Sequence, residues 1–188
     1  MVQFTAHTED TAPEGSKPLI AKSKAAFGRL PGLHAVLAES PEAYEGYQAL
    51  HALFLATSFT DEEKTVVWQT INVENRCHYC VPAHTGIAKA MKVDDAVTEA
   101  LRNETPLPTA KLEALRDFTL KVMRQDGFVS GADTEAFLAA GFTTRNVLEV
   151  ILGLAQKVMS NYTNHFAQTP VDPVMQKFAW TPAQTAAE

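Results

Sequence analysis

Apolar residues repeat at helical spacing along most of this chain, and this feature restricts its fold more than any other. The longest pattern begins after an N-cap at Thr143 or Thr144 and continues to about residue 166, before Pro170 and Pro173. One apolar stripe in it is expected to face the core or a subunit interface: Val147, Val150, Ile151, Leu154 and Val158. The sequence shows no convincing alternation of period two between hairpin turns, and no repeat at a fixed period. We therefore predict an all-α protein.

Capping residues and helix breakers divide the rest of the chain. Ser40 followed by Pro41 and Glu42 predicts a helix that continues to about residue 57. Thr60 with Glu63 forms a capping box, which predicts a helix from residue 61 to about 73. Further helices are expected at residues 17–27, 94–103, 108–125 and 134–140, with a short one before Ser40.

Length and composition fit one globular domain. The chain has 188 residues, of which 46% are hydrophobic, enough to bury a single core. The first fifteen residues are polar and lack a hydrophobic period, so we expect a flexible N-terminal tail at 1–15. A single helical domain is expected at 16–170, followed by a C-terminal tail or arm at 171–188.

Charge and hydropathy limit the partners. Sixteen Lys and Arg against twenty-two Asp and Glu give a net charge of −6, the wrong sign for binding phosphates, so we expect neither a nucleic acid nor a membrane partner. The longest strongly apolar stretch, at 49–56, is far shorter than the roughly twenty residues of a spanning helix. Because the N-terminus also lacks the features of a secretory signal, we expect a cytoplasmic protein. The stretch at 49–56 is apolar on almost all sides of its helix, and such a surface is easier to bury in an oligomer than in a monomer.

The two cysteines of the chain, Cys77 and Cys80, form a Cys-x-x-Cys motif, which in a reducing cytoplasm is more often catalytic or metal-binding than structural. Pro82 is tolerated only in or near the first turn of a helix, so a helix should begin close to residues 77–79. Cys80 then lies in that turn, where unpaired backbone N–H groups and the helix dipole favour a thiolate. His84 follows on the same face, with about 5 to 6 Å between the Cβ atoms.

Thiolate formation alone does not explain catalysis at such a site. Lowering a thiol pKa from about 8.5 to about 6 raises the thiolate fraction about thirtyfold at pH 7, but the lower basicity reduces nucleophilicity by roughly tenfold. We therefore expect His84 to take the proton from Cys80 and later to supply one to a leaving oxygen, a role worth about a hundredfold or more. Its partner should be a carboxylate. Glu74 is the nearest by sequence, and Glu63 lies on the preceding helix.

The chain resembles the carboxymuconolactone decarboxylase and alkylhydroperoxidase D-like superfamily, in its peroxidase-related branch that carries a Cys-x-x-Cys motif. The motif is N-x-C-x-Y-C-x-x-A-H, which here is Asn75, Cys77, Tyr79, Cys80, Ala83 and His84. A later segment also resembles members of this group: Asn161, Tyr162, Asn164 and His165, followed by Thr169 and Pro170.

This resemblance implies an AhpD-like helical bundle that assembles as a homotrimer or homohexamer and reduces alkyl hydroperoxides as a thiol peroxidase. Cys80 would be the peroxidatic thiol, and Cys77 would convert its sulfenic acid into a disulfide. The reductant would be a thiol or a lipoyl-bearing protein. The glutamate that relays protons in the family stands twelve residues before the first cysteine, and here that position is Thr65. Either Glu74 or Glu63 would take over its task, and we favour Glu74, three residues before Cys77.

Two other functions are compatible with the sequence. In a non-redox zinc-binding structural or interaction module, both thiolates and one histidine would be ligands, with a fourth from His51, His78 or His165. In a carboxymuconolactone-type decarboxylase the cysteines would be dispensable, but the true lactone decarboxylases lack the paired cysteines. No glycine-rich phosphate-binding loop occurs, and we expect no bound cofactor.

Overall fold

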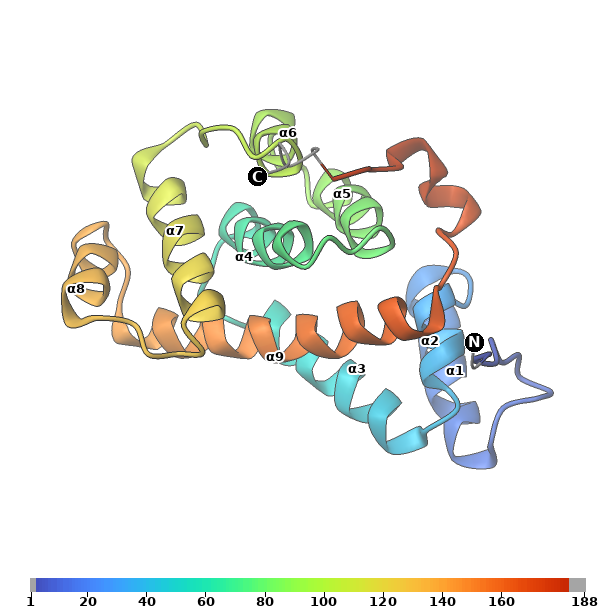
Figure 1. Cartoon of the computed structure of the whole chain (residues 1–188). Helices are drawn as coiled ribbons and strands as arrows, with labels where there is room; N and C mark the ends of the chain where they lie inside the picture. The colour runs from blue at the N-terminus through green and yellow to red at the C-terminus, as the bar shows by residue number, and fades with distance from the viewer. Residues whose placement is uncertain (1–2, 183–188) are drawn as a thin grey trace.

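The computed structural model describes residues 3–182, a range that contains helices and no strand (Figure 1). The helices in chain order are α1 (Lys17–Phe27), α2 (Gly32–Leu37), α3 (Pro41–Leu55), α4 (Asp61–Glu74), α5 (Cys80–Ala90), α6 (Asp95–Arg102), α7 (Ala110–Arg124), α8 (Gly131–Ala139) and α9 (Thr144–Ala167). Two short 3-10 helices, η1 (Glu14–Ser16) and η2 (Pro173–Phe178), lie near the two ends. The predicted all-α class is confirmed.

Helix α4 is the centre of the fold. Every residue from Glu63 to Val73 is buried, and α5, α6, α7 and α9 surround the helix (Figure 1). The predicted capping box starts it, because Thr60 Oγ1 accepts from the backbone N–H of Glu63, whose carboxylate accepts from the N–H of Thr60. This central position puts the end of α4, and the loop after it, next to α9.

Local capping explains where the other helices begin. Ser40 caps α3 by accepting a hydrogen bond from the N–H of Ala43, as the sequence predicts. Helix α8 begins at Gly131, three residues before the predicted start at Thr134. The cause is Ser130, whose hydroxyl accepts a hydrogen bond from the N–H of Asp133 and so caps an earlier turn.

The apolar stripe predicted on α9 is divided between the core and the surface. Of the predicted apolar stripe only Val150 is fully buried, and Ile151 is 47% exposed. The buried face is largely polar: Asn146, Glu149, Val150, Gly153, Gln156, Lys157, Ser160, Asn161 and Asn164. Hydrogen bonds to the neighbouring helices satisfy many of these side chains. The apolar stripe flanks this polar face, and its partly buried members Val147 and Leu154 pack against the core.

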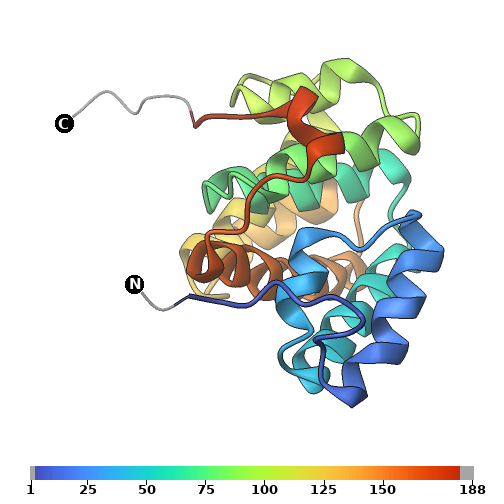
Figure 2. The ribbon, with the colours of Figure 1, turned by 90° about the vertical axis from the view of Figure 1, so that its right-hand side faces the viewer.

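Both chain ends lie against the helices in the residues described. The backbone N–H of His7 donates to the carbonyl of Ala35 in α2, although the segment before η1 has no helix. Residues 169–182 run from the end of α9 across α5 and α6 (Figure 2), where Trp180 Nε1 donates to the carbonyl of Arg102. We call this segment the C-terminal arm. Residues 183–188 of the predicted arm lie outside the described residues.

Between residues 3 and 182, no single helix is both long and apolar enough to cross a membrane; α8 and α9 pass that test only as a pair bent by 107°.

Candidate active site

The loop between α4 and α5 brings the two cysteines together. It leaves α4 through Arg76, which has a left-handed φ of 50°, and the N–H of Cys77 returns to the carbonyl of Asn72. Helix α5 then begins at Cys80, whose backbone N–H donates to Cys77 Sγ over 3.3 Å. Cys80 therefore lies in the first helical turn, as predicted, with the sulfur of Cys77 beside the helix N-terminus.

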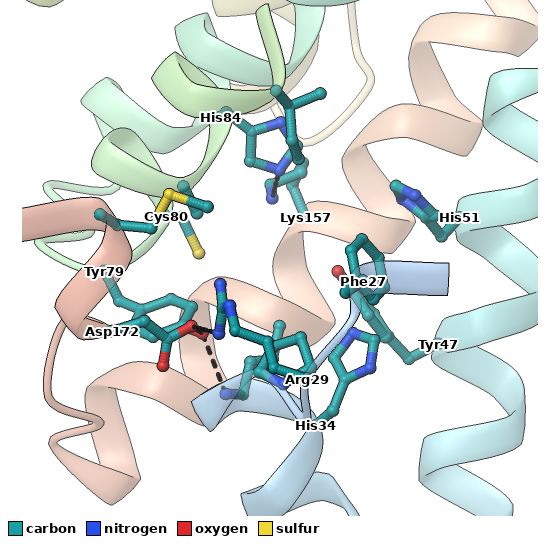
Figure 3. Close-up of a pocket in the computed structure, with 15 residues that line it drawn as sticks. Phe27, Arg29, His34, Tyr47, His51, Tyr79, Cys80, His84, Lys157 and Asp172 are labelled. Atoms are coloured by element: carbon teal, nitrogen blue, oxygen red, sulfur yellow. Dashed lines mark hydrogen bonds and ion pairs between the residues drawn. The ribbon is translucent and has the colours of Figure 1, made fainter. Parts of the chain in front are cut away.

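Cys80 lines a cavity of about 90 Å³ between the α1–α2 loop, α3, α5, α9 and the C-terminal arm (Figure 3). Its lining combines apolar and aromatic side chains with charged, imidazole and thiol groups, which are Arg29, His34, His51, Cys80, His84, Lys157 and Asp172. A water molecule needs about 10–15 Å³ of such space, so the cavity can hold a small ligand. Figure 3 shows Cys80 on α5 and Lys157 on α9 facing this cavity.

His84 is hydrogen-bonded to a buried lysine. Lys157 Nζ lies 2.8 Å from His84 Nε2, and the two residues are 1% and 5% exposed. An ammonium group cannot accept a hydrogen bond, so when Lys157 is charged Nε2 is the acceptor and the proton of the neutral ring is on Nδ1. Burial and the charge of Lys157 hold the pKa of His84 well below its usual value, which keeps the ring neutral.

The sulfur of Cys80 has donors on several sides. Asn164 Nδ2 donates to Cys80 Sγ over 3.3 Å. Burial by itself raises the pKa of Cys80, but the hydrogen bond from Cys77, the charge of Lys157 and the amides of Asn164 and Asn161 lower it to about 5. The pKa of Cys77 is raised, by its hydrogen bond to Cys80 and by burial. The arrangement therefore favours a thiolate at Cys80 and a neutral thiol at Cys77.

A ladder of side-chain amides holds Asn161 in place. Its Nδ2 donates to Asn72 Oδ1 over 3.0 Å, and its Oδ1 accepts from Asn75 Nδ2 over 2.9 Å. Asn72 in turn donates to Gln69 Oε1 within α4. The later segment singled out in the sequence thus meets the cysteine motif through Asn161 and Asn164.

The C-terminal arm is attached beside the cavity by Asp172. Its carboxylate accepts from Arg29 Nη1 at 2.6 Å, from the Tyr79 hydroxyl at 2.9 Å and from the N–H of Gly32 at 3.1 Å. These bonds connect the arm to the α1–α2 loop and to the residue before Cys80. Sequence reasoning missed Asp172, because nothing near it in the chain predicts these partners.

The two carboxylates considered for the proton relay lie elsewhere. Glu74 accepts from Nε and Nη2 of Arg124, at 2.7 Å each, and Glu63 pairs with Lys111 at 2.7 Å. Neither lines the cavity that contains Cys80. The structure thus brings Cys77, Cys80 and His84 together without Glu74 or Glu63, and the expected carboxylate partner of His84 is corrected to Lys157.

Lys157 was not found from the sequence, although a signal was present. Lys157, Asn161 and Asn164 follow one another at helical spacing on α9, a polar stripe beside an apolar one. For the zinc alternative, the residues described include no group of three or more His, Cys, Asp or Glu placed to hold a metal ion. His78 is instead bonded to the carbonyl of Thr169 through Nε2.

No protein-family model matches the chain, and no curated protein matches it. Solved structures do share its fold. An uncharacterized peroxidase-related protein from Ralstonia eutropha JMP134, described as an alkylhydroperoxidase AhpD core, superposes with a TM-score of 0.82 at 21% identity, over 92% of this chain and 93% of that one. An uncharacterized peroxidase-related protein from Silicibacter sp. TM1040 gives a TM-score of 0.76 at 19% identity, over 91% and 93% of the two chains.

The debrominase Bmp8, as an alanine variant in complex with 2,3,4-tribromopyrrole, gives a TM-score of 0.77 at 14% identity, over 94% and 95% of the two chains. The chain therefore has the AhpD-like fold, which confirms the predicted helical bundle. Proteins of this fold carry more than one activity, so the function must be argued from the site.

Proposed function

We propose that this chain is a thiol peroxidase that reduces a hydroperoxide at Cys80. One observation carries the proposal: Cys80 faces a small cavity while Asn164 and Lys157 stabilise its thiolate and Cys77 lies beside it. A thiolate is the nucleophilic form of cysteine, and a second thiol close by can convert an oxidised sulfur into a disulfide.

The reaction proceeds in two steps. The Cys80 thiolate attacks the terminal oxygen of a hydroperoxide ROOH, so that an S–O bond forms, the O–O bond breaks and an alkoxide leaves. The sulfur is oxidised to a sulfenic acid, and the alkoxide takes a proton to become an alcohol. The Cys77 sulfur then attacks Cys80, an S–S bond replaces the S–O bond, and the hydroxide leaves as water with the proton of Cys77.

We assign proton transfer to the pair of His84 and Lys157, since both line the cavity into which the alkoxide would leave. General acid catalysis of this kind contributes about a hundredfold or more. Thiol–disulfide exchange with a thiol or a lipoyl-bearing protein would return Cys77 and Cys80 to the reduced state. We propose no cofactor and no metal in this cycle.

We also propose that the chain forms a homo-oligomer. Large apolar side chains remain exposed on the outer faces of α3 and α9: Leu53, Leu55, Leu148, Ile151, Tyr162 and Phe166. Exposed apolar side chains on two neighbouring helices are typical of a subunit interface. The trimer and the hexamer implied by the resemblance are distinguished by the mass of the particle in sedimentation equilibrium.

Single-turnover peroxide consumption by the fully reduced protein tests the proposed function. Cys80→Ser should abolish consumption, whereas Cys77→Ser should consume one equivalent and accumulate a sulfenic acid, detected by mass spectrometry after trapping with dimedone. His84→Gln should slow the first step. Consumption that survives Cys80→Ser would refute the assignment, and lactone turnover that persists in the double serine variant would favour the decarboxylase.

A further inference from the structure

We propose that Lys157 is the catalytic acid of this site: it holds the proton given up by Cys80 in the reduced protein, loses it when Cys80 is oxidised, and is neutral in the Cys77–Cys80 disulfide. This inference rests on the proposed function and identifies the source of the proton that the departing oxygen needs. It also predicts that disulfide formation exchanges no proton with the solvent.

The Lys157 side chain is isolated from solvent and from carboxylates. It is 1% exposed, and its hydrogen-bond partner in the described structure is His84 Nε2, a neutral acceptor. The one carboxylate among the residues that line the cavity is Asp172, which is already bonded to Arg29 and Tyr79. The negative charge available to Lys157 is therefore the thiolate of Cys80.

The histidine side chains that face Lys157 from α2 and α3 are neutral. From α3, His51 is fixed as a neutral ring: Trp68 Nε1 donates to Gln156 Oε1, so the Gln156 amide donates to His51 Nδ1, and the ring proton is on Nε2. From α2, His34 is bonded to Ser23, and burial lowers the pKa values of His34 and His51 to about 4.

The remaining groups that face Lys157 carry no net charge that could balance its ammonium group. On the α3 side, the phenol of Tyr47 is neutral at pH 7, because burial raises its pKa. On α5, His84 is neutral and Cys77 is a thiol. Arg29 and Asp172 neutralise each other. Oxidation of Cys80 thus removes the one charge that balances Lys157.

Because Lys157 is desolvated, loss of the Cys80 thiolate should make its ammonium group lose a proton. A buried ammonium is tolerated next to an anion but is strongly disfavoured when that anion disappears. Burial already lowers the pKa of Lys157, and the two cysteines are the groups that raise it. Once both sulfurs are in a disulfide, the neutral amine is the favoured form, and the proton leaves with the product.

The stoichiometry of the reaction is then complete within the site. Reduction of ROOH to ROH and water needs two electrons and two protons. The two sulfurs supply both electrons, the Cys77 thiol supplies one proton, and the Lys157 ammonium supplies the other. Reduction of the disulfide by a dithiol returns one proton to Cys77 and one to Lys157. His84 takes part in this proton transfer through its hydrogen bond with Lys157, since its Nε2 accepts from Nζ and holds it at the cavity.

Proton counting with a chemical oxidant tests the inference without requiring peroxidase activity. Reduced protein at pH 7, in weak buffer with an indicator dye, is treated with one equivalent of diamide, which accepts two electrons and two protons as the disulfide forms. Thiolate absorbance at 240 nm is followed at the same time. For the wild type we expect thiolate absorbance that is lost on oxidation, and no net proton uptake.

Two variants provide the comparison. Lys157→Arg keeps the charge but cannot release a proton, so it should take up one proton from solution for each disulfide formed. Lys157→Met has an apolar side chain of similar length and should lose the thiolate absorbance at pH 7.

Two results for the wild type would contradict the inference. Uptake of one proton by the wild type would mean that Lys157 stays charged, and absence of the wild-type thiolate signal would mean that Cys80 keeps its own proton. Either wild-type result overturns the inference, and neither depends on the variants folding. If diamide gives the expected count but peroxide is not consumed, the peroxidase proposal fails alone.

Discussion

The side-chain amide of Asn164 donates a hydrogen bond to Cys80 Sγ over 3.3 Å, although the two residues are 84 positions apart in the chain. The amide stabilises a thiolate without adding a second positive charge beside Lys157. Its oxygen, Oδ1, is buried without a partner among the residues described, so the surrounding structure leaves one polar atom unsatisfied while it presents the donor to the sulfur. We therefore regard Asn164 as a positioning residue for the thiolate.

Removing this donor should raise the pKa of Cys80. A hydrogen bond to a charged group contributes about 1.5–3 kcal/mol, and one pKa unit corresponds to about 1.4 kcal/mol, so Asn164→Leu should shift the pKa upward by about one to two units. The measurement is the rate of alkylation by iodoacetamide as a function of pH. Asn103→Leu, at an exposed position after α6, is the control and should leave the profile unchanged. An unshifted profile for Asn164→Leu would remove Asn164 from the site.

The depressed pKa of Cys80 also predicts how stability changes with pH. The pKa is about 5 in the folded protein and lies near the ordinary value of 9.0 in the unfolded chain, so the folded state binds fewer protons between these values. The stabilisation from the thiolate is complete above the unfolded pKa and is lost as the pH falls through about 5. Lys157 loses its own proton on folding when the thiolate is absent, so the reference is the double variant Cys80→Ser with Lys157→Met. Urea unfolding of the reduced protein should show the wild type gaining stability over this double variant between pH 5 and pH 8. A difference that does not change with pH would show that Cys80 ionises normally.

The carboxylates favoured from the sequence should be dispensable for chemistry. Glu74 is bonded to Arg124 away from the cavity, so Glu74→Gln should leave the rate of peroxide reduction unchanged and reduce stability by at most about 1 kcal/mol. Glu63→Gln should likewise spare the rate while weakening the start of α4. Single-turnover kinetics and urea unfolding separate the two effects. A tenfold slower first step in Glu74→Gln would return that residue to the proton relay.

Short-range signals were enough to predict most helix boundaries. Thr60 and Ser40 cap their helices through contacts within three residues, so the printed sequence already contains both partners. Pro82 fixed the start of α5 in the same way, because a proline is restricted by its own backbone. The position of Cys80 in the first turn followed from these local rules.

The long-range part of the site could not be predicted in this way. The buried side of α9 is chosen by polar contacts with distant residues, such as that of Gln156 with Trp68, and not by its apolar stripe. Lys157 and His84 are 73 positions apart in the chain, and they meet only because α5 and α9 pack together. Apolar periodicity assigns the stripe of α9 to the core or to an interface, but it does not show that polar side chains beside that stripe are buried.

Close packing of α9 against α3 and α4 depends on Gly153. A Cβ atom there would lie 2.6 Å from Phe54 Cε2 and 2.9 Å from Val67 Cγ1, and both neighbours are buried. Gly153→Ala should therefore lower the free energy of unfolding by about 1–3 kcal/mol, measured by urea denaturation. Gly46→Ala is a matched control, since a Cβ atom there would lie 3.9 Å from Met159 Cε and alanine favours the helix by about 0.5–1 kcal/mol. Destabilisation by Gly46→Ala and not by Gly153→Ala would contradict this packing.

The attachment of the C-terminal arm predicts how Cys80 is shielded. Asp172→Ala removes the acceptor shared by Arg29 and Tyr79, so the arm should separate from the α1–α2 loop and open the cavity on that side. Alkylation of the reduced protein by a bulky maleimide should then accelerate more than alkylation by iodoacetamide, because the small reagent needs less space to reach the sulfur. Asp95→Ala removes an exposed ion pair with Lys89 and should change neither rate. Equal acceleration for both reagents would indicate a change in the reactivity of the thiolate, and no acceleration would show that the arm stays closed without Asp172.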